Sequence, residues 1–278
     1  MTQEQRLDYL VERFREDSGE YRDLRVGSSG EEKRRVLRSL MNVRLPGDMD
    51  TETMEVQNAY LRGRAEEKGI VTPDSIPTSK DPRFSLWQGD ITRLAVDAIV
   101  NAANSQMLGC FVPMHNCIDN CIHTFAGVQL RGECARQMGI LRARYGRDYE
   151  QPTAAPMLTD GFNLPAKKVV HVVGPIVQGN VTRKIQRDLA SCYQNTLDLC
   201  AENGLRTVAF CCISTGVFHF PPERAAKIAV KTVVDWFRYR ETYFDDAGVD
   251  RVIFNVFNDR DRVIYERLLK RIDVLTDI

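Results

Sequence analysis

Two cysteines and one histidine stand close together in the chain, where they could bind a metal ion. Cys110, His115 and Cys117 fall within eight consecutive positions, shortly after the run NAANS at residues 101–105. Thiolate and imidazole groups suit zinc, and three protein ligands leave one coordination position for water or substrate. The competing interpretation is that the cysteines pack as small apolar residues and the histidine lies in a loop.

Other residues that could bind a ligand lie where apolar runs of the sequence end. Asp90 follows the first run, and its carboxylate could accept a hydrogen bond from a ligand amino group or cap a helix. Asn101 and Asn104 end the second run, where side-chain amides could bind a ligand or satisfy buried backbone groups. Phe257 ends the last run and could stack on a flat base or pack in the core.

Residues 214–218 (STGVF) follow another apolar run and have the composition of a phosphate-binding loop. Gly216 permits close approach of the backbone, and the successive N–H groups of Ser214, Thr215 and Val217 could surround a diphosphate. Such turns occur in many α/β proteins, so the loop by itself does not identify a ligand.

Short apolar runs that alternate with longer amphipathic segments predict an α/β/α sandwich on a mostly parallel sheet. The expected strands are residues 84–87, 95–101, 168–173, 207–213 and 251–257. The expected helices are residues 117–126, 130–145, 182–203, 222–239 and 261–271. Ligands bind at the carboxyl ends of the strands in open parallel sheets, and every motif described above follows a strand.

The N-terminal part of the chain has a different pattern. Three helical segments and no chemical motif occupy the first 70 residues or so, and the proline-rich residues 72–82 are typical of a linker. We therefore expect a helical extension over residues 1–75 that packs on a main domain over residues 83–272.

The composition excludes several classes of partner. Lys and Arg number 38, as do Asp and Glu, so the bulk charge favours neither nucleic acid nor an anionic membrane surface. The charged N-terminus lacks an apolar signal region, and no apolar run approaches the roughly 18 residues of a membrane span. We expect a cytoplasmic protein whose eight cysteines are mostly reduced.

Three strings of residues, in this order, resemble a macrodomain, the ADP-ribose-binding α/β module. They are GDIT at 89–92, NAANS at 101–105 and ISTGVFHFPPERAA at 213–226. The resemblance implies a three-layer α/β/α sandwich on a mixed, mostly parallel sheet. It also implies roles for individual residues: adenine contacts from Asp90, Ile91 and Phe257, distal-ribose contacts from Asn104 and Phe218, and phosphate contacts from Ser214, Thr215, Gly216 and Val217.

The segment 109–123 departs from ordinary macrodomains, which carry a glycine run there. In its place the sequence reads GCFVPMHNCIDNCIH, which resembles the zinc-dependent macrodomains linked to bacterial sirtuin-type ADP-ribosyltransferases. Cys121, His123 and Cys134 lie close enough in sequence to be alternative ligands, but the resemblance implies Cys110, His115 and Cys117. It further implies substrate contacts from four residues after the loop: Cys117, Ile118, Asp119 and Asn120.

This resemblance implies a zinc-dependent protein-ADP-ribose hydrolase that removes mono-ADP-ribose from Asp or Glu side chains and reverses sirtuin-type ADP-ribosylation. Asp119 and Asn104 would be the catalytic residues: Asp119 would orient the ribose or act as general base, and Asn104 would hold the distal ribose, although Asp119 could also cap a helix. The expected partners are ADP-ribose and a modified protein such as a lipoyl carrier. The alternatives are an ADP-ribose-binding module without activity and a hydrolase of O-acetyl-ADP-ribose.

Overall fold

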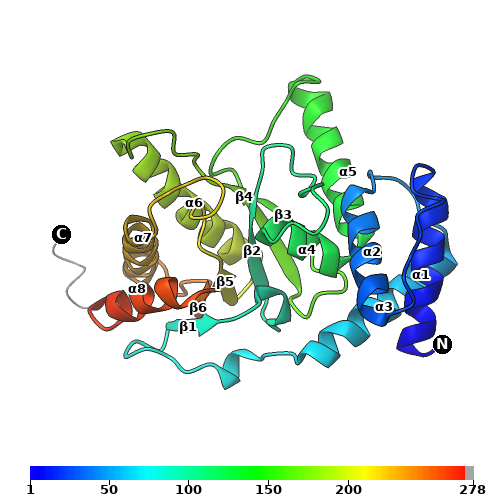
Figure 1. Ribbon diagram of the computed structural model, residues 1–278. Coiled ribbons are helices and arrows are strands. Elements are labelled where there is room, and N and C mark those ends of the chain that lie inside the picture. Colours follow the sequence, from blue (N-terminus) through cyan, green and yellow to red (C-terminus); the bar gives the residue numbers. More distant parts are fainter. Residues whose placement is uncertain (273–278) are drawn as a thin grey trace.

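A six-stranded sheet forms the centre of the computed structural model, which describes residues 1–272 (Figure 1). Its strands are β1 (Phe84–Gln88), β2 (Ala98–Ala103), β3 (Met157–Asp160), β4 (Lys168–Val173), β5 (Thr207–Phe210) and β6 (Arg251–Val256). Their order across the sheet is β1-β6-β5-β2-β4-β3, and every neighbouring pair is parallel except the antiparallel pair of β3 and β4. The predicted macrodomain-like fold is therefore confirmed.

The central strands are largely apolar because helices cover both of their faces. Val169, Val170 and Val172 of β4 are completely buried, as are Ile99 and Val100 of β2. Branched side chains of this kind suit a pleated surface that is buried on both sides.

Five helices flank the sheet and shield its two faces from solvent. They are α4 (Ile118–Ala126), α5 (Val128–Tyr145), α6 (Arg183–Glu202), α7 (Pro222–Tyr243) and α8 (Asp259–Leu269). Figure 1 shows α4 and α5 on one side of the sheet and α6 and α7 on the other. Three of these helices begin at residues that favour a helix start. Thr182 and Asn258 are the N-caps of α6 and α8 and accept hydrogen bonds from backbone N–H groups, and Pro222 is the first residue of α7.

The N-terminal extension is helical, and it lies outside α4 on the right of Figure 1. It consists of α1 (Gln3–Ser18), α2 (Gly30–Val43) and α3 (Thr51–Lys68). These three helices share an apolar cluster of their own, which includes Leu10, Phe14 and Leu40. Both α2 and α3 pack against α4, so the extension lies beside the helix that follows the expected metal loop.

The sequence did not predict strand β3. Its four residues are too short for a visible alternation of apolar and polar positions, and two prolines stand close before it, at positions 152 and 156. The strand forms at the edge of the sheet because its backbone pairs with β4, which is a tertiary effect. Over residues 1–272, no helix is both long enough and apolar enough to cross a membrane.

Candidate active site

The loop between β2 and α4 brings the three expected metal ligands together. The ligand atoms of Cys110, His115 and Cys117 all lie within 4.8 Å of one another, and the Cys110 Sγ is 3.4 Å from the His115 Nδ1. Cys117 is also the N-cap of α4, where its Sγ accepts a hydrogen bond from the backbone N–H of Asn120 at 3.4 Å. Two sulfurs and one imidazole at this separation suit zinc by donor type, and all three residues line a cavity.

The alternative ligands lie elsewhere. Cys121 also lines the cavity, but the three-residue cluster does not include it. His123 and Cys134 form a second cluster with His171, deep in the core. His171 already has partners there, since its Nδ1 lies 3.0 Å from the Asn101 amide and its Nε2 lies 3.0 Å from the Thr159 hydroxyl. This second group lines no part of the large cavity.

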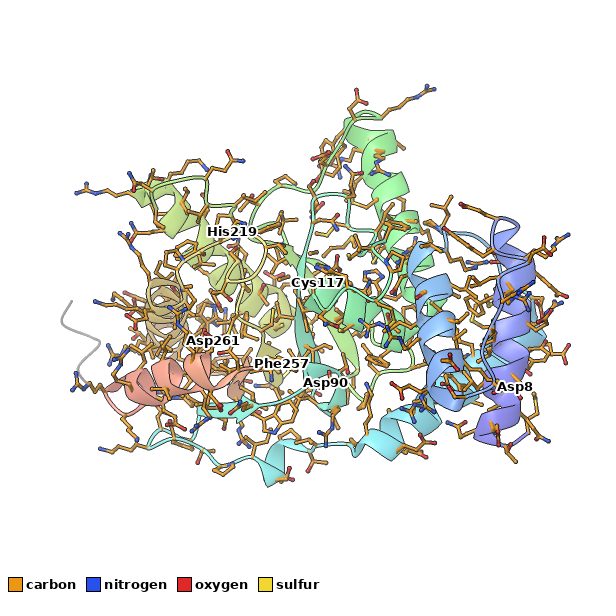
Figure 2. All side chains as sticks on the ribbon, in the orientation of Figure 1. Asp8, Asp90, Cys117, His219, Phe257 and Asp261 are labelled. Carbon is orange, nitrogen blue, oxygen red and sulfur yellow. The ribbon has the colours of Figure 1, made fainter. Side chains whose placement is uncertain are left out.

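The cavity runs along the carboxyl ends of the strands and has a volume of about 1190 Å³. Figure 2 shows Asp90 and Phe257 near each other and Cys117 higher in the same region. Fourteen of the fifteen predicted ligand-contacting or metal-binding residues line it: Asp90, Ile91, Asn104, Cys110, His115, Cys117, Ile118, Asp119, Ser214, Thr215, Gly216, Val217, Phe218 and Phe257. 

Asn120 is the one predicted residue that does not line the cavity.

Asn120 holds the metal loop in shape instead of facing the cavity. It is fully buried, and its side-chain amide donates hydrogen bonds to the backbone oxygens of Cys110 at 3.2 Å and Val112 at 3.0 Å. The side chain of Asn120 therefore does not face the cavity, because the loop backbone already occupies its amide.

Asp119 lies at the start of α4 beside the metal loop, held by two asparagines. Its Oδ1 accepts a hydrogen bond from the Asn101 amide at 2.7 Å, and its Oδ2 accepts one from the Asn104 amide at 3.2 Å. Burial raises the pKa of Asp119 to about 6, and the hydrogen bond from Asn101, the nearby Arg131 charge and the Asn104 hydrogen bond oppose this rise. The result is a buried carboxyl group of fixed orientation that still lines the cavity.

Asp90 and Phe257 define the opposite end of the cavity. Asp90 caps a short 3₁₀ turn, Ile91–Arg93, because its Oδ1 accepts hydrogen bonds from the backbone N–H and the hydroxyl of Thr92. Phe257 follows β6 and is 79% exposed, which excludes the alternative that it packs in the core. An exposed ring beside a carboxylate suits a flat heterocycle that carries an amino group.

The loop at residues 214–218 has the backbone of an anion site. Ser214 has a φ of 65°, which turns the chain sharply four residues after the end of β5. Gly216 leaves open space, since a Cβ there would meet no atom within 4 Å. The hydrogen bonds within residues 1–272 give the amides of Gly216, Val217 and Phe218 no protein acceptor, so these N–H groups are free for a ligand.

Two cavity residues come from the N-terminal extension, which we had expected to carry no chemistry. Arg38 of α2 and Lys68 of α3 both line the cavity. The Lys68 Nζ lies 3.3 Å from the Asp90 Oδ2 and 3.2 Å from the centre of the Phe125 ring. The sequence offers no local signal for either residue, because both belong to charge-rich helices that resemble ordinary surface helices.

The chain is similar to known proteins over nearly its whole length. The macro domain family matches residues 100–229. A protein-ADP-ribose hydrolase of Treponema medium is 44% identical over 97% of this chain and 100% of that protein. A protein-ADP-ribose hydrolase of Staphylococcus aureus strain Mu50 is 42% identical over 96% of each chain. Since only a few per cent of this chain lies outside these matches, they extend through α1–α3.

A solved structure agrees with the fold. The Trypanosoma brucei macrodomain in complex with ADP-ribose has a TM-score of 0.61 and 27% identity, over 84% of this chain and 94% of that one. The sheet order, the motif strings and the extent of the sequence matches agree with one another. The chain therefore belongs to the macrodomain family.

Proposed function

We infer that this protein is a zinc-dependent hydrolase that releases mono-ADP-ribose from Asp or Glu side chains of a modified protein. One observation carries the proposal: Cys110, His115 and Cys117 converge in a loop that opens onto the same cavity as the buried carboxyl of Asp119. The names of the full-length relatives in Treponema medium and Staphylococcus aureus support hydrolysis. An open three-ligand site is also typical of catalytic zinc, whereas structural zinc is usually held by four protein ligands.

The cavity can hold ADP-ribose along its length. Asp90 would accept a hydrogen bond from the adenine amino group, and Phe257 would stack on the base. The free amides of residues 216–218 would donate hydrogen bonds to the diphosphate. In this orientation Asn104 and Phe218 contact the distal ribose, which lies beside the metal loop.

The chemistry takes place at that ribose. A zinc ion held by Cys110, His115 and Cys117 would supply a Lewis acid next to the bond that is cleaved. Asp119 is positioned by Asn101 and Asn104 to accept a proton from a ribose hydroxyl or an attacking water molecule. The substrate that we propose to test first is a lipoyl-carrier protein modified by a sirtuin-type transferase.

Metal analysis of purified protein tests the zinc assignment. We expect about one zinc ion per chain, bound by the three-residue cluster. Cys110→Ala, His115→Ala and Cys117→Ala should each lose the metal, whereas Cys134→Ala should keep it because Cys134 lies in the core. Full zinc retention by the Cys117 variant would overturn the assignment.

A release assay on the same preparations tests the activity. Removal of zinc should abolish release of ADP-ribose from an ester-modified carrier protein, as followed by mass spectrometry. Calorimetry with ADP-ribose on the metal-free protein is the control, since a disordered loop could also reduce release. Undiminished release without zinc would make the metal structural. No release by the zinc-loaded wild type, despite tight ADP-ribose binding, would make the protein an ADP-ribose-binding module.

A further inference from the structure

Helix α2 reaches the metal loop through the partly buried guanidinium group of Arg38. The Arg38 Nη2 donates a hydrogen bond to the backbone oxygen of His115 at 2.8 Å and another to the Asn120 Oδ1 at 2.9 Å. It also lies 3.6 Å from the Cys121 Sγ. Arg38 has no carboxylate partner among the salt bridges of the described residues, so its polar contacts are with the metal loop and the start of α4.

The same helix holds the loop at a second point, one turn further along. The Asn42 Oδ1 accepts a hydrogen bond from the backbone N–H of Met114 at 3.0 Å, and its amide donates to the Thr124 hydroxyl at 2.9 Å. Met114 has a φ of 58°, a conformation that costs energy for a residue with a side chain. The hydrogen bond that Asn42 accepts from Met114 therefore stabilises a strained turn directly before the ligand His115.

Asn120 completes the arrangement from inside the protein. Its amide holds the backbone oxygens of Cys110 and Val112, while its Oδ1 accepts the bond from Arg38. The loop has little apolar packing of its own, since Val112 is 57% exposed. Its shape consequently depends on a polar network that joins α2, the loop and α4.

Helix α2 is itself fixed to the main domain at its carboxyl end. The Arg131 Nη1 donates hydrogen bonds to the backbone oxygens of Met41 at 3.1 Å and Asn42 at 3.0 Å. The Arg131 Nε donates to the backbone oxygen of Leu108, directly before the metal loop, at 2.8 Å. One buried side chain thus caps carbonyl groups at the end of α2 and anchors the start of the loop.

We propose that α2 of the N-terminal extension is part of the metal site, and that Arg38 and Asn42 are positioning residues that set its affinity for zinc. They fix the backbone on both sides of His115, so that the imidazole and the two cysteine sulfurs converge before metal binds. Without these two side chains, metal binding itself would have to order an exposed loop, and the conformational entropy lost in doing so would weaken the affinity for zinc. The proposal rests on the proposed zinc site and assigns the extension a function beyond packing.

Titration of the protein with zinc in competition with a chromophoric chelator tests the proposal. Arg38→Gln and Asn42→Ala should each bind zinc about 10- to 100-fold more weakly than wild type, which is the usual effect of removing a partner that orients metal ligands. Arg38→Lys should fall between wild type and Arg38→Gln, because an ammonium keeps the charge but cannot form the same pair of bonds. Arg35→Gln is the matched control, because Arg35 is exposed on the same helix. This variant should bind zinc with wild-type affinity.

Two further measurements separate positioning from a general loss of stability. In the metal-free protein, amide hydrogen exchange over residues 108–117 should be faster in Arg38→Gln and Asn42→Ala than in wild type, with exchange in β4 unchanged. At saturating zinc, Asn42→Ala should release ADP-ribose at a rate close to that of wild type, because Asn42 does not line the cavity.

The outcomes distinguish this proposal from the proposed function. Wild-type protein without zinc affinity would refute the zinc site itself. Wild-type zinc affinity in both variants would overturn only the role of α2. A release rate of Asn42→Ala that stays low at saturating zinc would also overturn it, because it would place Asn42 in substrate binding or in folding. Faster amide exchange throughout the variants, including β4, would also overturn the positioning role of α2, because it would indicate a general loss of stability.

Discussion

The most constrained residue of the site is Asp119, whose carboxyl is buried and bound by two amides. Asn101 and Asn104 both donate to it, and Asn101 also contacts His171 in the core, so the orientation of the carboxyl is set from below the cavity. A buried group held in this way has little freedom to move toward a substrate. The substrate ribose must instead be brought to it, which is the role that we assign to the loop at residues 214–218 and to Asn104.

Substitution of Asp119 tests its role in proton transfer. Asp119→Asn keeps the shape of the side chain but cannot accept the proton, so release of ADP-ribose should fall by on the order of a hundredfold or more. Zinc content and ADP-ribose affinity should stay within a few-fold of wild type, as metal analysis and calorimetry would measure. A variant that retains full activity would exclude Asp119 as the acid or base and leave it as a structural residue in the first turn of α4.

At the scale of elements, the sequence predicted five of the six strands and all five helices of the main domain. The prediction worked because the long segments are strongly periodic and the ligand-binding motifs follow their strands. It failed for β3, whose four residues form a strand only through pairing with β4. It also did not show that the Asn120 amide bonds the loop backbone, because sequence order cannot distinguish a side chain that faces the cavity from one that turns toward the loop.

The loop at residues 214–218 offers a test that separates ligand binding from folding. A Cβ at Gly216 would meet no protein atom within 4 Å, so Gly216→Ala should leave the melting temperature of the ligand-free protein nearly unchanged. The added methyl group would lie where the backbone approaches the diphosphate, so the affinity for ADP-ribose, measured by calorimetry, should fall by about tenfold or more.

Gly139→Ala on α5 is the matched control, because its added Cβ also meets nothing within 4 Å and it lies away from the cavity. The control should bind ADP-ribose with wild-type affinity. Equal affinity in the Gly216 variant would show that the diphosphate does not lie against this loop.

At the scale of the whole molecule, the N-terminal extension is joined to the macrodomain mainly by polar contacts. Gln57 of α3 donates to the Gln129 side chain, and the Asn58 Oδ1 accepts bonds from the amides of Gln129 and Asn163. Sequence patterns reveal apolar periodicity, so they predicted the helices of the extension but not these pairs, which connect residues far apart in the chain. Sequence patterns also could not predict that Arg38 and Lys68 line the cavity, because the residues that they meet there are far away in the chain.

The polar junction predicts that the extension and the macrodomain unfold together. Both tryptophans, Trp87 and Trp236, lie in the macrodomain, whereas far-ultraviolet circular dichroism also reports on α1–α3. Urea unfolding curves from tryptophan fluorescence and from circular dichroism should therefore have the same midpoint. Arg131→Gln should lower the dichroism midpoint below the fluorescence midpoint, because it removes the hydrogen bonds of a charged donor to the end of α2, each worth about 1.5–3 kcal/mol. Separate midpoints in the wild type would mean that the extension unfolds independently, and α2 could then not hold the metal loop in the way that Arg38 and Asn42 indicate.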